Sequence, residues 1–281
     1  DIPRIKKKSV MKKVFEKSGL PAARGKVLRS LRGALAFAEE VGYPLVAKPD
    51  MGVGASHTYK ITNPTEMVNL FKAGLPADFI FEEFIQGGII SFDGLADERC
   101  EPVFFTSHIF SQGIMETVND DMDIFYYSVR EIPVDLERAG RALLKAFRVQ
   151  KRFFHFEFFR TNDHQLVPLE VNMRPPGGLT TDMFNYANDM DIYAGWANLI
   201  VNNRFDLAYE RSYYCAYVGR KNNLAYAHNH IEIVSRFGQR VVHFQPIEGV
   251  FRGAIGDFGY LVRSTDLSEI FAMSAYIRQK A

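Results

Sequence analysis

Residues 153–174 read FFHFEFFRTNDHQLVPLEVNMR, and this stretch decides the expected fold. A polar cluster separates two apolar runs, which is the pattern of two antiparallel strands joined by a turn. If Asp163 and His164 form a two-residue loop, Glu157 faces Glu170 directly across the strand pair. The stretch therefore predicts a hairpin with two carboxylates on one face.

Strand alternation adds an amide and a guanidinium to that face. Glu170, Asn172 and Arg174 share one side of the second strand, with Glu157 opposite. Facing carboxylates repel, so we expect a cation near them. Carboxylate and amide oxygens suit Mg²⁺, which commonly binds one or two carboxylates and completes its shell with substrate phosphates. The alternative is a half-buried hairpin whose glutamates pair with surface lysines; the aromatic neighbours on both strands favour the metal site.

A lysine and a glycine-containing loop stand together earlier in the chain. Residues 43–48 form a short apolar run that predicts a strand ending at Lys48, and Gly52, Gly54 and Ser56 lie in the loop after it. The order of residues fits neither a P-loop nor a dinucleotide fingerprint. Such a loop can still bring backbone N–H groups to phosphates, with lysine as a point charge. Taken alone, it is more typical of a plain turn.

Residues 79–85, FIFEEFI, predict another strand. Glu82 and Glu83 point to opposite faces because they are adjacent, and taken alone they are typical of an edge strand with solvated charges. The chain becomes rich in predicted strands after this segment, so we place a boundary there between two domains, residues 1–86 and 87–281. In the second, residues 135–147 and 181–201 predict one helix each.

Together these segments resemble the ATP-grasp family. The resemblance runs from about Lys8 to Gly178, with the motifs in the family's order. It implies an α+β fold in which two α+β subdomains grip a nucleotide between antiparallel sheets. Lys8 resembles the family's first phosphate-binding lysine and Lys48 the second, and the loop from Gly52 to Ser56 resembles the one that closes over ATP.

The resemblance also implies roles for the remaining motifs. The hinge strand, where backbone groups and a glutamate read the adenine, corresponds to Glu82, Glu83, Phe84 and Ile85. The set that binds two Mg²⁺ ions, for which Mn²⁺ can substitute, corresponds to Glu157, Glu170 and Asn172. Arg174 matches the arginine that contacts the transferred phosphoryl group or the acyl phosphate.

The sequence departs from the family pattern at two points. No acidic residue follows the hinge to hold the ribose hydroxyls, and Asp93 is the nearest replacement. Family members usually begin with a further α/β domain, whereas this chain starts where that domain should end. We therefore expect the chain to be the grasp portion of a longer protein.

The activity implied by the resemblance is an ATP-dependent ligase reaction. A small carboxylate is activated as an acyl phosphate and attacked by an amine, with release of ADP and phosphate. Two alternatives stay open: a carboxylase or carbamoyl-phosphate-like enzyme of the same fold, and a non-catalytic nucleotide-binding module. The expected partners are ATP and the two small substrates, and a homodimer is compatible with the resemblance.

Composition bears on the partners and the cellular compartment of the protein. Lysine and arginine total 34 against 33 aspartate and glutamate among 281 residues, which leaves no basic excess for nucleic-acid binding. The 2 cysteines fit a reducing compartment, and no apolar stretch is long enough to span a membrane. We expect a cytoplasmic protein that binds neither nucleic acid nor membrane.

Overall fold

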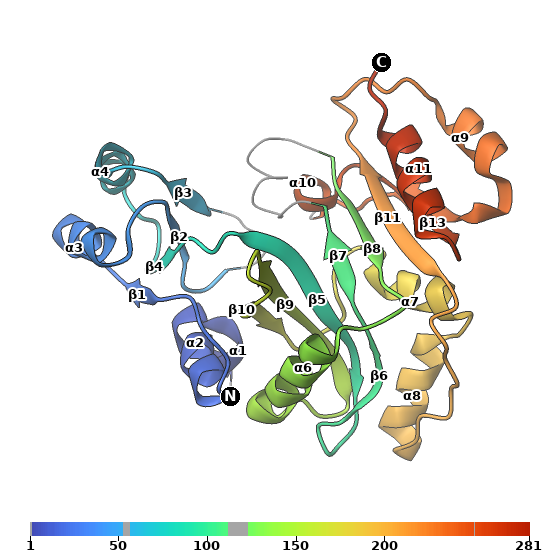
Figure 1. The fold of residues 1–281 in the computed structure, drawn as a ribbon, viewed down its shortest axis with the longest axis horizontal. Coiled ribbons are helices and arrows are strands. Elements are labelled where there is room, and N and C mark those ends of the chain that lie inside the picture. The colour runs from blue at the N-terminus through green and yellow to red at the C-terminus, as the bar shows by residue number, and fades with distance from the viewer. Residues whose placement is uncertain (1, 53–56, 112–122, 250) are drawn as a thin grey trace. The chain divides into compact units, whose positions relative to one another are not determined.

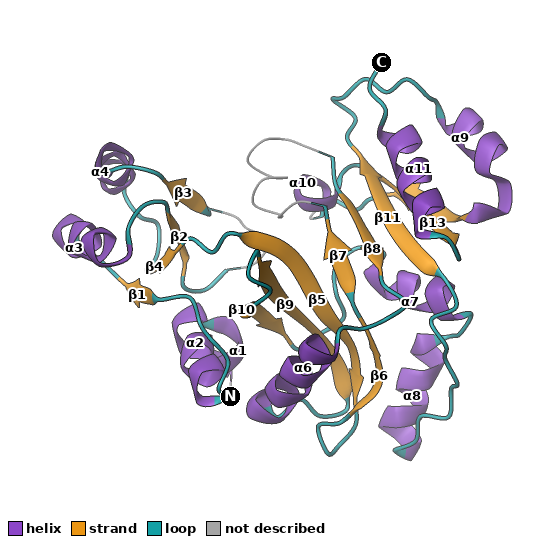
Figure 2. Cartoon of the chain, viewed as in Figure 1, coloured by secondary structure: helices purple, strands orange, loops and turns teal. Residues whose placement is uncertain are grey.

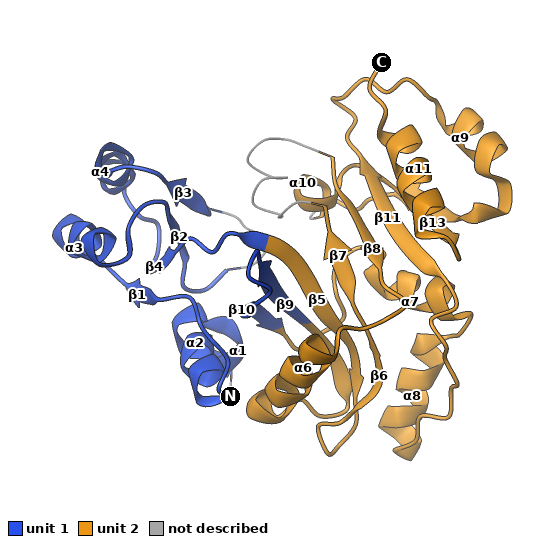
Figure 3. Cartoon of the chain, viewed as in Figure 1, with its two compact units in different colours: residues 1–87, 156–171 blue, residues 88–155, 172–281 orange. Residues whose placement is uncertain are grey.

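The computed structural model describes residues 2–52, 57–111, 123–249 and 251–281 (Figure 1). Helices and strands are mixed along the chain, and the paired strands run antiparallel, which confirms the predicted α+β class (Figure 2). Contacts divide the chain into unit 1, residues 1–87 with 156–171, and unit 2, residues 88–155 with 172–281 (Figure 3). None of the described helices is both long and apolar enough to cross a membrane.

Unit 1 begins with helices and a small sheet. Its elements, in chain order, are α1 (Ile2–Lys6), α2 (Lys8–Lys17), β1 (Gly25–Val27), α3 (Leu31–Val41), β2 (Leu45–Pro49), β3 (Tyr59–Ile61), α4 (Pro64–Ala73) and β4 (Phe79–Glu83), followed much later by most of β9 (Arg152–Thr161) and β10 (Leu166–Asn172).

The four-stranded sheet of unit 1 has the order β1-β4-β2-β3. Alternate residues of its two inner strands, Leu45 and Ala47 on β2 with Phe79 and Phe81 on β4, are fully buried in one apolar cluster with residues of α3 and α4. The intervening residues point to the opposite face, because side chains alternate along a strand. That second face therefore carries Lys48 and Glu82.

Local capping contacts fix the start of helix α4. Asn63 caps it by accepting a hydrogen bond from the Glu66 N–H at 3.0 Å, and Pro64 occupies the first position. The Glu66 carboxylate in turn accepts the Thr62 N–H at 2.7 Å. These contacts satisfy backbone donors that a helix start leaves without partners.

Unit 2 holds the remaining elements. They are β5 (Gly87–Ala96), β6 (Pro102–Thr106), β7 (His108–Phe110), β8 (Phe125–Ser128), α6 (Val134–Phe147), the start of β9, α7 (Thr180–Asn188), α8 (Ile192–Asn202), β11 (Tyr214–Arg220), α9 (His230–Phe237), η1 (Gly238–Arg240), β12 (Val241–Pro246), α10 (Arg252–Ile255), β13 (Phe258–Ser264) and α11 (Leu267–Arg278).

The sheet of unit 2 is apolar on both faces. Its strands run in the order β5-β7-β8-β11-β13-β12, with β6 also paired to β5. On β11, Cys215 and Tyr217 pack with Met183 of α7, whereas Ala216 and Val218 pack with residues of α11. Helices thus cover both sides of its centre, which explains the nearly continuous apolar sequence of β11.

Helix α6 lies unusually close to β5. A Cβ atom added at Gly140 would stand 2.1 Å from the Phe92 ring, which is far inside van der Waals contact. Glycine at this helical position therefore permits the close approach of helix and strand. The predicted helix over residues 135–147 is confirmed by α6.

Two local predictions are wrong. The hairpin loop has three residues rather than two, because the Thr161 N–H donates to Gln165 O at 3.0 Å and the His164 N–H to Thr161 O at 2.9 Å. His164 adopts a left-handed conformation, φ 63°, as the third residue of such loops does. The premise of a two-residue turn behind the direct Glu157–Glu170 pairing therefore fails.

The expected single helix over residues 181–201 is in fact two helices. Asp189 ends α7 in a left-handed conformation, φ 48°. Asp191 then caps α8 by accepting the N–H groups of Tyr193 and Ala194 at 3.0 and 3.1 Å. The apolar residues keep their helical spacing across this break, so the sequence pattern did not reveal that Asp191 caps a second helix.

Candidate functional site

The start of helix α2 holds the stem of the glycine-containing loop. Asp50, directly after β2, accepts hydrogen bonds from the Ser9 N–H at 2.8 Å and from the Ser9 hydroxyl at 2.9 Å. The Lys8 N–H donates to Asp50 O at 2.9 Å, and Lys8 Nζ donates to Gly52 O at 3.0 Å. The aspartate thereby caps the helix from a distant segment, and Lys8 is brought to the loop that follows Lys48.

Lys8 also reaches the metal-ligand candidate on the hairpin. Its Nζ lies 3.8 Å from Glu170 Oε1, with both side chains mostly enclosed. Burial lowers the pKa of the Lys8 ammonium, the charge of Lys48 lowers it further, and the charge of Glu170 opposes the change. A cation thus stands beside Glu170, as the sequence led us to expect, and it is the predicted phosphate lysine.

Glu82 is enclosed between two lysines on the face of the sheet opposite α3 and α4. Lys48 Nζ lies 2.6 Å from Oε2 and Lys12 Nζ lies 2.9 Å from Oε1. The three side chains are only 8–10% exposed. Strand register explains the meeting: Val46 pairs with Glu82, so Lys48 lies diagonally across from Glu82 on the same face.

This arrangement keeps Glu82 ionised. Burial alone raises the pKa of its carboxyl, but the charges of Lys48 and Lys12 and their hydrogen bonds outweigh burial and lower the pKa to about 2. Burial also lowers the pKa of Lys12, against the opposing charge of Glu82. The cluster of one carboxylate and two ammonium groups carries a net charge of +1 when all three are ionised.

The other hinge residues have different surroundings. Glu83 accepts the Arg24 N–H at 2.7 Å and Arg24 Nε at 2.8 Å, so its carboxylate ties β4 to the segment before β1. Phe84 and Ile85 are half-buried, and Lys60 Nζ stands 4.2 Å above the Phe84 ring. Gly54 and Ser56 fall outside the described residues.

Strand β10 carries the remaining predicted ligands. Glu170 and Asn172 occupy alternate, half-buried positions near its end. Glu157 is half-buried on β9. Arg174 follows β10, and its Nη1 donates to Pro175 O at 2.7 Å. The structure therefore places these residues on the predicted hairpin and directly after it.

A buried hydroxyl pair holds the far end of the loop after Arg174. Thr180, the first residue of α7, donates to Gly177 O at 2.8 Å, and its Oγ1 lies 2.8 Å from the Tyr126 hydroxyl. Because the threonine proton is used by Gly177, Tyr126 is the donor in the second bond. This pair anchors the loop to β8.

The donor set fits a hard divalent cation. Among the described residues, no group of three or more histidine, cysteine, aspartate or glutamate side chains is arranged to hold a metal. An ion at Glu157, Glu170 and Asn172 would therefore use at most two carboxylates and an amide oxygen. That is the partial protein shell that Mg²⁺ accepts when phosphates and water supply its other ligands.

A second buried polar centre lies inside unit 2, and the sequence did not reveal it. Asp93 on β5 is fully buried. Its carboxylate is hydrogen-bonded to His155 Nδ1 at 2.5 Å, to His108 Nδ1 at 2.6 Å and to the Ser91 hydroxyl. Burial raises the pKa of the Asp93 carboxyl, but the charge of His155 and the histidine hydrogen bonds outweigh it and hold the pKa well below its usual range. A carboxylate so enclosed does not suit the ribose contact expected for Asp93.

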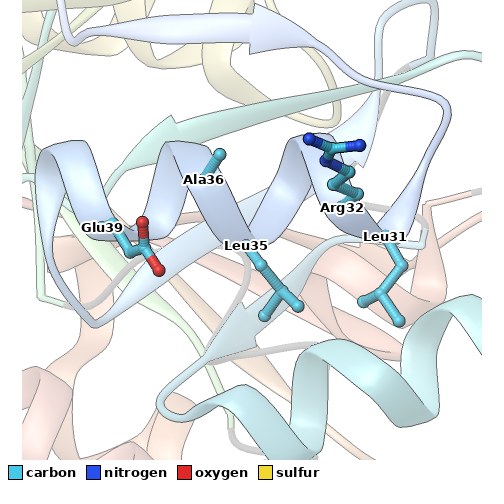
Figure 4. Close-up of a pocket in the computed structure, with 5 residues that line it drawn as sticks. All are labelled: Leu31, Arg32, Leu35, Ala36 and Glu39. Atoms are coloured by element: carbon cyan, nitrogen blue, oxygen red, sulfur yellow. The ribbon is translucent and has the colours of Figure 1, made fainter.

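One surface hollow of unit 1 lies apart from the predicted residues. It has a volume of about 440 Å³ and is lined by Leu31, Arg32, Leu35, Ala36 and Glu39, all from α3 (Figure 4). Leu31 and Leu35 point the same way from the helix. The lining brings no lysine or metal-binding pair together, so it does not match the chemistry of a nucleotide site.

Comparison with known proteins identifies the same family that the order of the sequence motifs resembles. The sequence profile of the ATP-grasp domain matches residues 41–182, half of the chain. The chain belongs to the ATP-grasp family.

Two curated relatives are ligases. D-alanine–D-alanine ligase of Pseudomonas fluorescens is 29% identical over 102 residues, 35% of this chain and 32% of that protein. The L-arginine-specific L-amino acid ligase of Bacillus subtilis is 22% identical over 203 residues, 69% of this chain and 49% of that protein. The chain thus spans about a third of the length of the first relative and about half of the second.

Solved structures share the fold across nearly the whole chain. An ADP complex of N5-carboxyaminoimidazole ribonucleotide synthetase superposes with a TM-score of 0.74 at 15% identity, covering 97% of this chain and 71% of that one. The L-amino acid ligase from Bacillus licheniformis gives 0.73 at 15% identity, covering 97% and 70%. The predicted ATP-grasp fold is confirmed.

Proposed function

We propose that this chain carries the ATP-dependent activation of a small carboxylate as an acyl phosphate, which an amine then attacks with release of ADP and phosphate. The observation that carries the proposal is the position of Lys8, one of the two predicted phosphate lysines. It contacts both the stem of the glycine-containing loop at Gly52 and the metal-ligand candidate Glu170.

The residues of the chain have distinct roles in this reaction. Lys8 and Lys48 bind phosphate oxygens. The backbone around Phe84 and Ile85, together with Glu82 and Glu83, forms the adenine end of the site, where the base is bound. Gly52, Gly54 and Ser56 cover the phosphates. Arg174 stabilises the charge on the transferred group, because phosphoryl transfer depends mainly on positioning and charge neutralisation.

Glu157, Glu170 and Asn172 hold two Mg²⁺ ions, with Mn²⁺ as a substitute. When bound, the ions neutralise the phosphate oxygens and help to align them. The two glutamates act as ligands and not as proton acceptors, since a bound divalent ion keeps a carboxylate ionised. The relatives whose names specify ligases of amino acids favour an amino acid or a similar small molecule for the carboxylate substrate.

The test is phosphate and ADP release by the full chain with Mg²⁺, against a panel of carboxylates, each with and without amines. We expect release that requires both a carboxylate and Mg²⁺. Glu170→Ala should abolish turnover by removing a metal ligand, whereas Glu16→Ala, an exposed glutamate of α2, should leave it unchanged.

Two results would contradict the ligase proposal. ATP hydrolysis triggered by bicarbonate alone indicates a carboxylase. ATP binding without turnover in the native chain, unaffected by Glu170→Ala, indicates a nucleotide-binding module.

A further inference from the structure

Lys12 is a third lysine of the Glu82 cluster, and the reaction proposed above gives it no part. It stands one helical turn after Lys8 on α2, so both side chains project from the same side of the helix. Lys12 Nζ is held twice, by Glu82 Oε1 at 2.9 Å and by Ala23 O at 2.6 Å. Its side chain is only 10% exposed.

Two anionic groups compete for the Lys48 ammonium: the Glu82 carboxylate and, in the proposed reaction, a phosphate of ATP. The same ammonium that should bind a phosphate lies 2.6 Å from Glu82 Oε2. If Lys48 moves to a phosphate, Glu82 stays behind in a buried place. A buried carboxylate without a cationic partner is strongly disfavoured, and this penalty would appear as weaker nucleotide binding.

We propose that Lys12 is a positioning residue for nucleotide binding, which neutralises Glu82 so that Lys48 can leave this carboxylate and bond a phosphate of ATP. Lys12 itself stays on Glu82 and Ala23 and does not contact the nucleotide. This inference rests on the proposed function, because it takes Lys48 as a phosphate ligand.

Charge balance and anchoring support the assignment of roles to the two lysines. Two ammonium groups face one carboxylate, so one of them is in excess and can serve an anion. Lys12 is fixed to the segment before β1 through the Ala23 carbonyl, whereas Lys48 is the second-last residue of β2, two positions before Asp50 in the stem of the loop. Lys48 is therefore the lysine that stands next to the stem of the proposed phosphate-binding loop.

The experiment measures ATP affinity of the full chain by titration calorimetry with Mg²⁺ at fixed salt, together with the Tm of each variant without nucleotide. Lys12→Met removes the charge but keeps the length of the side chain, and we expect ATP affinity to fall by about tenfold or more. In Lys12→Met/Glu82→Gln the carboxylate that needed neutralising is gone, so affinity should be within about threefold of that of Glu82→Gln alone, the reference that already carries any loss at the adenine end.

Lys13→Met is the matched control, since Lys13 is the exposed neighbour on the same helix. It should change ATP affinity by less than about twofold, as expected for a surface charge. Should Lys12→Met fail to fold, Lys12→Gln repeats the test with a side chain that can still donate to Ala23 O.

The outcomes separate the possible roles. Native-like affinity of Lys12→Met overturns the inference and leaves the proposed function intact. A double variant that binds ATP about tenfold or more weakly than Glu82→Gln alone also overturns it, because it would indicate a direct phosphate contact or a purely structural role for Lys12. Absence of ATP binding by the native chain overturns both the inference and the proposed function.

Discussion

Lys8 Nζ lies 3.8 Å from Glu170 Oε1, so the lysine expected to bind phosphate also stands beside an expected metal ligand. Without a metal, the ammonium offsets the charge of the carboxylate. A divalent ion at Glu170 would bring a second cation close to Lys8, and a phosphate between them would relieve the repulsion. Metal and nucleotide binding should therefore depend on each other at this point.

Lys8→Met tests this dependence. Removing the ammonium should tighten Mn²⁺ binding in the absence of nucleotide by about fivefold, since a partly exposed ion pair is worth about 1 kcal/mol. The same substitution should weaken binding of ATP with Mg²⁺ by about tenfold or more, because a phosphate ligand is lost. Electron paramagnetic resonance of free Mn²⁺ and calorimetry measure the two effects. Lys6→Met, on an exposed position of α1, is the control, and changes of the same sign in both measurements would contradict the argument.

The Glu82 cluster predicts a specific acid sensitivity. The pKa of Glu82 is about 2 in the folded chain against 4.5 as its ordinary value, so the unfolded chain binds more protons between these pH values. The free energy of unfolding should therefore rise with pH across this window. The contribution is complete above about pH 5 and is lost as pH falls toward 2, with a size of roughly 3 kcal/mol.

Urea denaturation at several pH values measures this contribution. Glu82→Gln should flatten the profile between pH 5 and 3 relative to the native chain. As a control, Glu16→Gln on the exposed side of α2 should keep the native profile. A native-like slope in Glu82→Gln would show that other carboxyl groups cause the acid sensitivity.

Asp93→Asn should be among the most destabilising single substitutions. It removes the fully buried carboxylate that lies within hydrogen-bond distance of two histidine Nδ1 atoms, and losing a buried hydrogen bond to a charged group costs about 1.5–3 kcal/mol for each bond. Asp163→Asn, at the exposed hairpin turn, should cost less than about 1 kcal/mol. Urea denaturation at neutral pH compares the two, and equal losses would refute the assignment.

The Tyr126–Thr180 contact predicts a difference between two conservative substitutions. Thr180→Val keeps the shape but leaves the Tyr126 hydroxyl without its acceptor and leaves the Gly177 carbonyl only the backbone N–H of residue 180 at 3.4 Å, at a cost of about 1–3 kcal/mol. Thr180→Ser keeps the hydroxyl and should cost less. If Arg174 acts as proposed, Thr180→Val should also lower kcat more than it raises KM for ATP, since the loop after Arg174 loses an anchor. The prediction fails if valine is tolerated as well as serine.

Sequence patterns could predict those parts of the site that lie within a single element. Glu170 and Asn172 occupy alternate positions of β10, as strand alternation predicts, and the Asn63 cap follows from its local chemistry. The family resemblance connected these segments, and the profile match and the shared fold confirm it.

Contacts between distant segments could not be predicted in this way. Asp93 meets His108 and His155 at separations of 15 and 62 residues, and no local pattern marks such partners. Lys12 looked like an ordinary helical lysine, because its role depends on β4 passing beneath α2. The predicted loop of Asp163 and His164 left out Asn162, because the hydrogen bonds between Thr161 and Gln165 and between His164 and Thr161, rather than the residue types, define the three-residue loop.

The division of unit 1 into residues 1–87 and 156–171 has a consequence for synthesis on the ribosome. When residue 87 has been made, Lys8 still lacks its partner Glu170. At typical elongation rates the hairpin follows only after several seconds. During that interval the nascent unit 1 lacks the strand that carries Glu170, so the ion pair with Lys8 is among the late contacts to form.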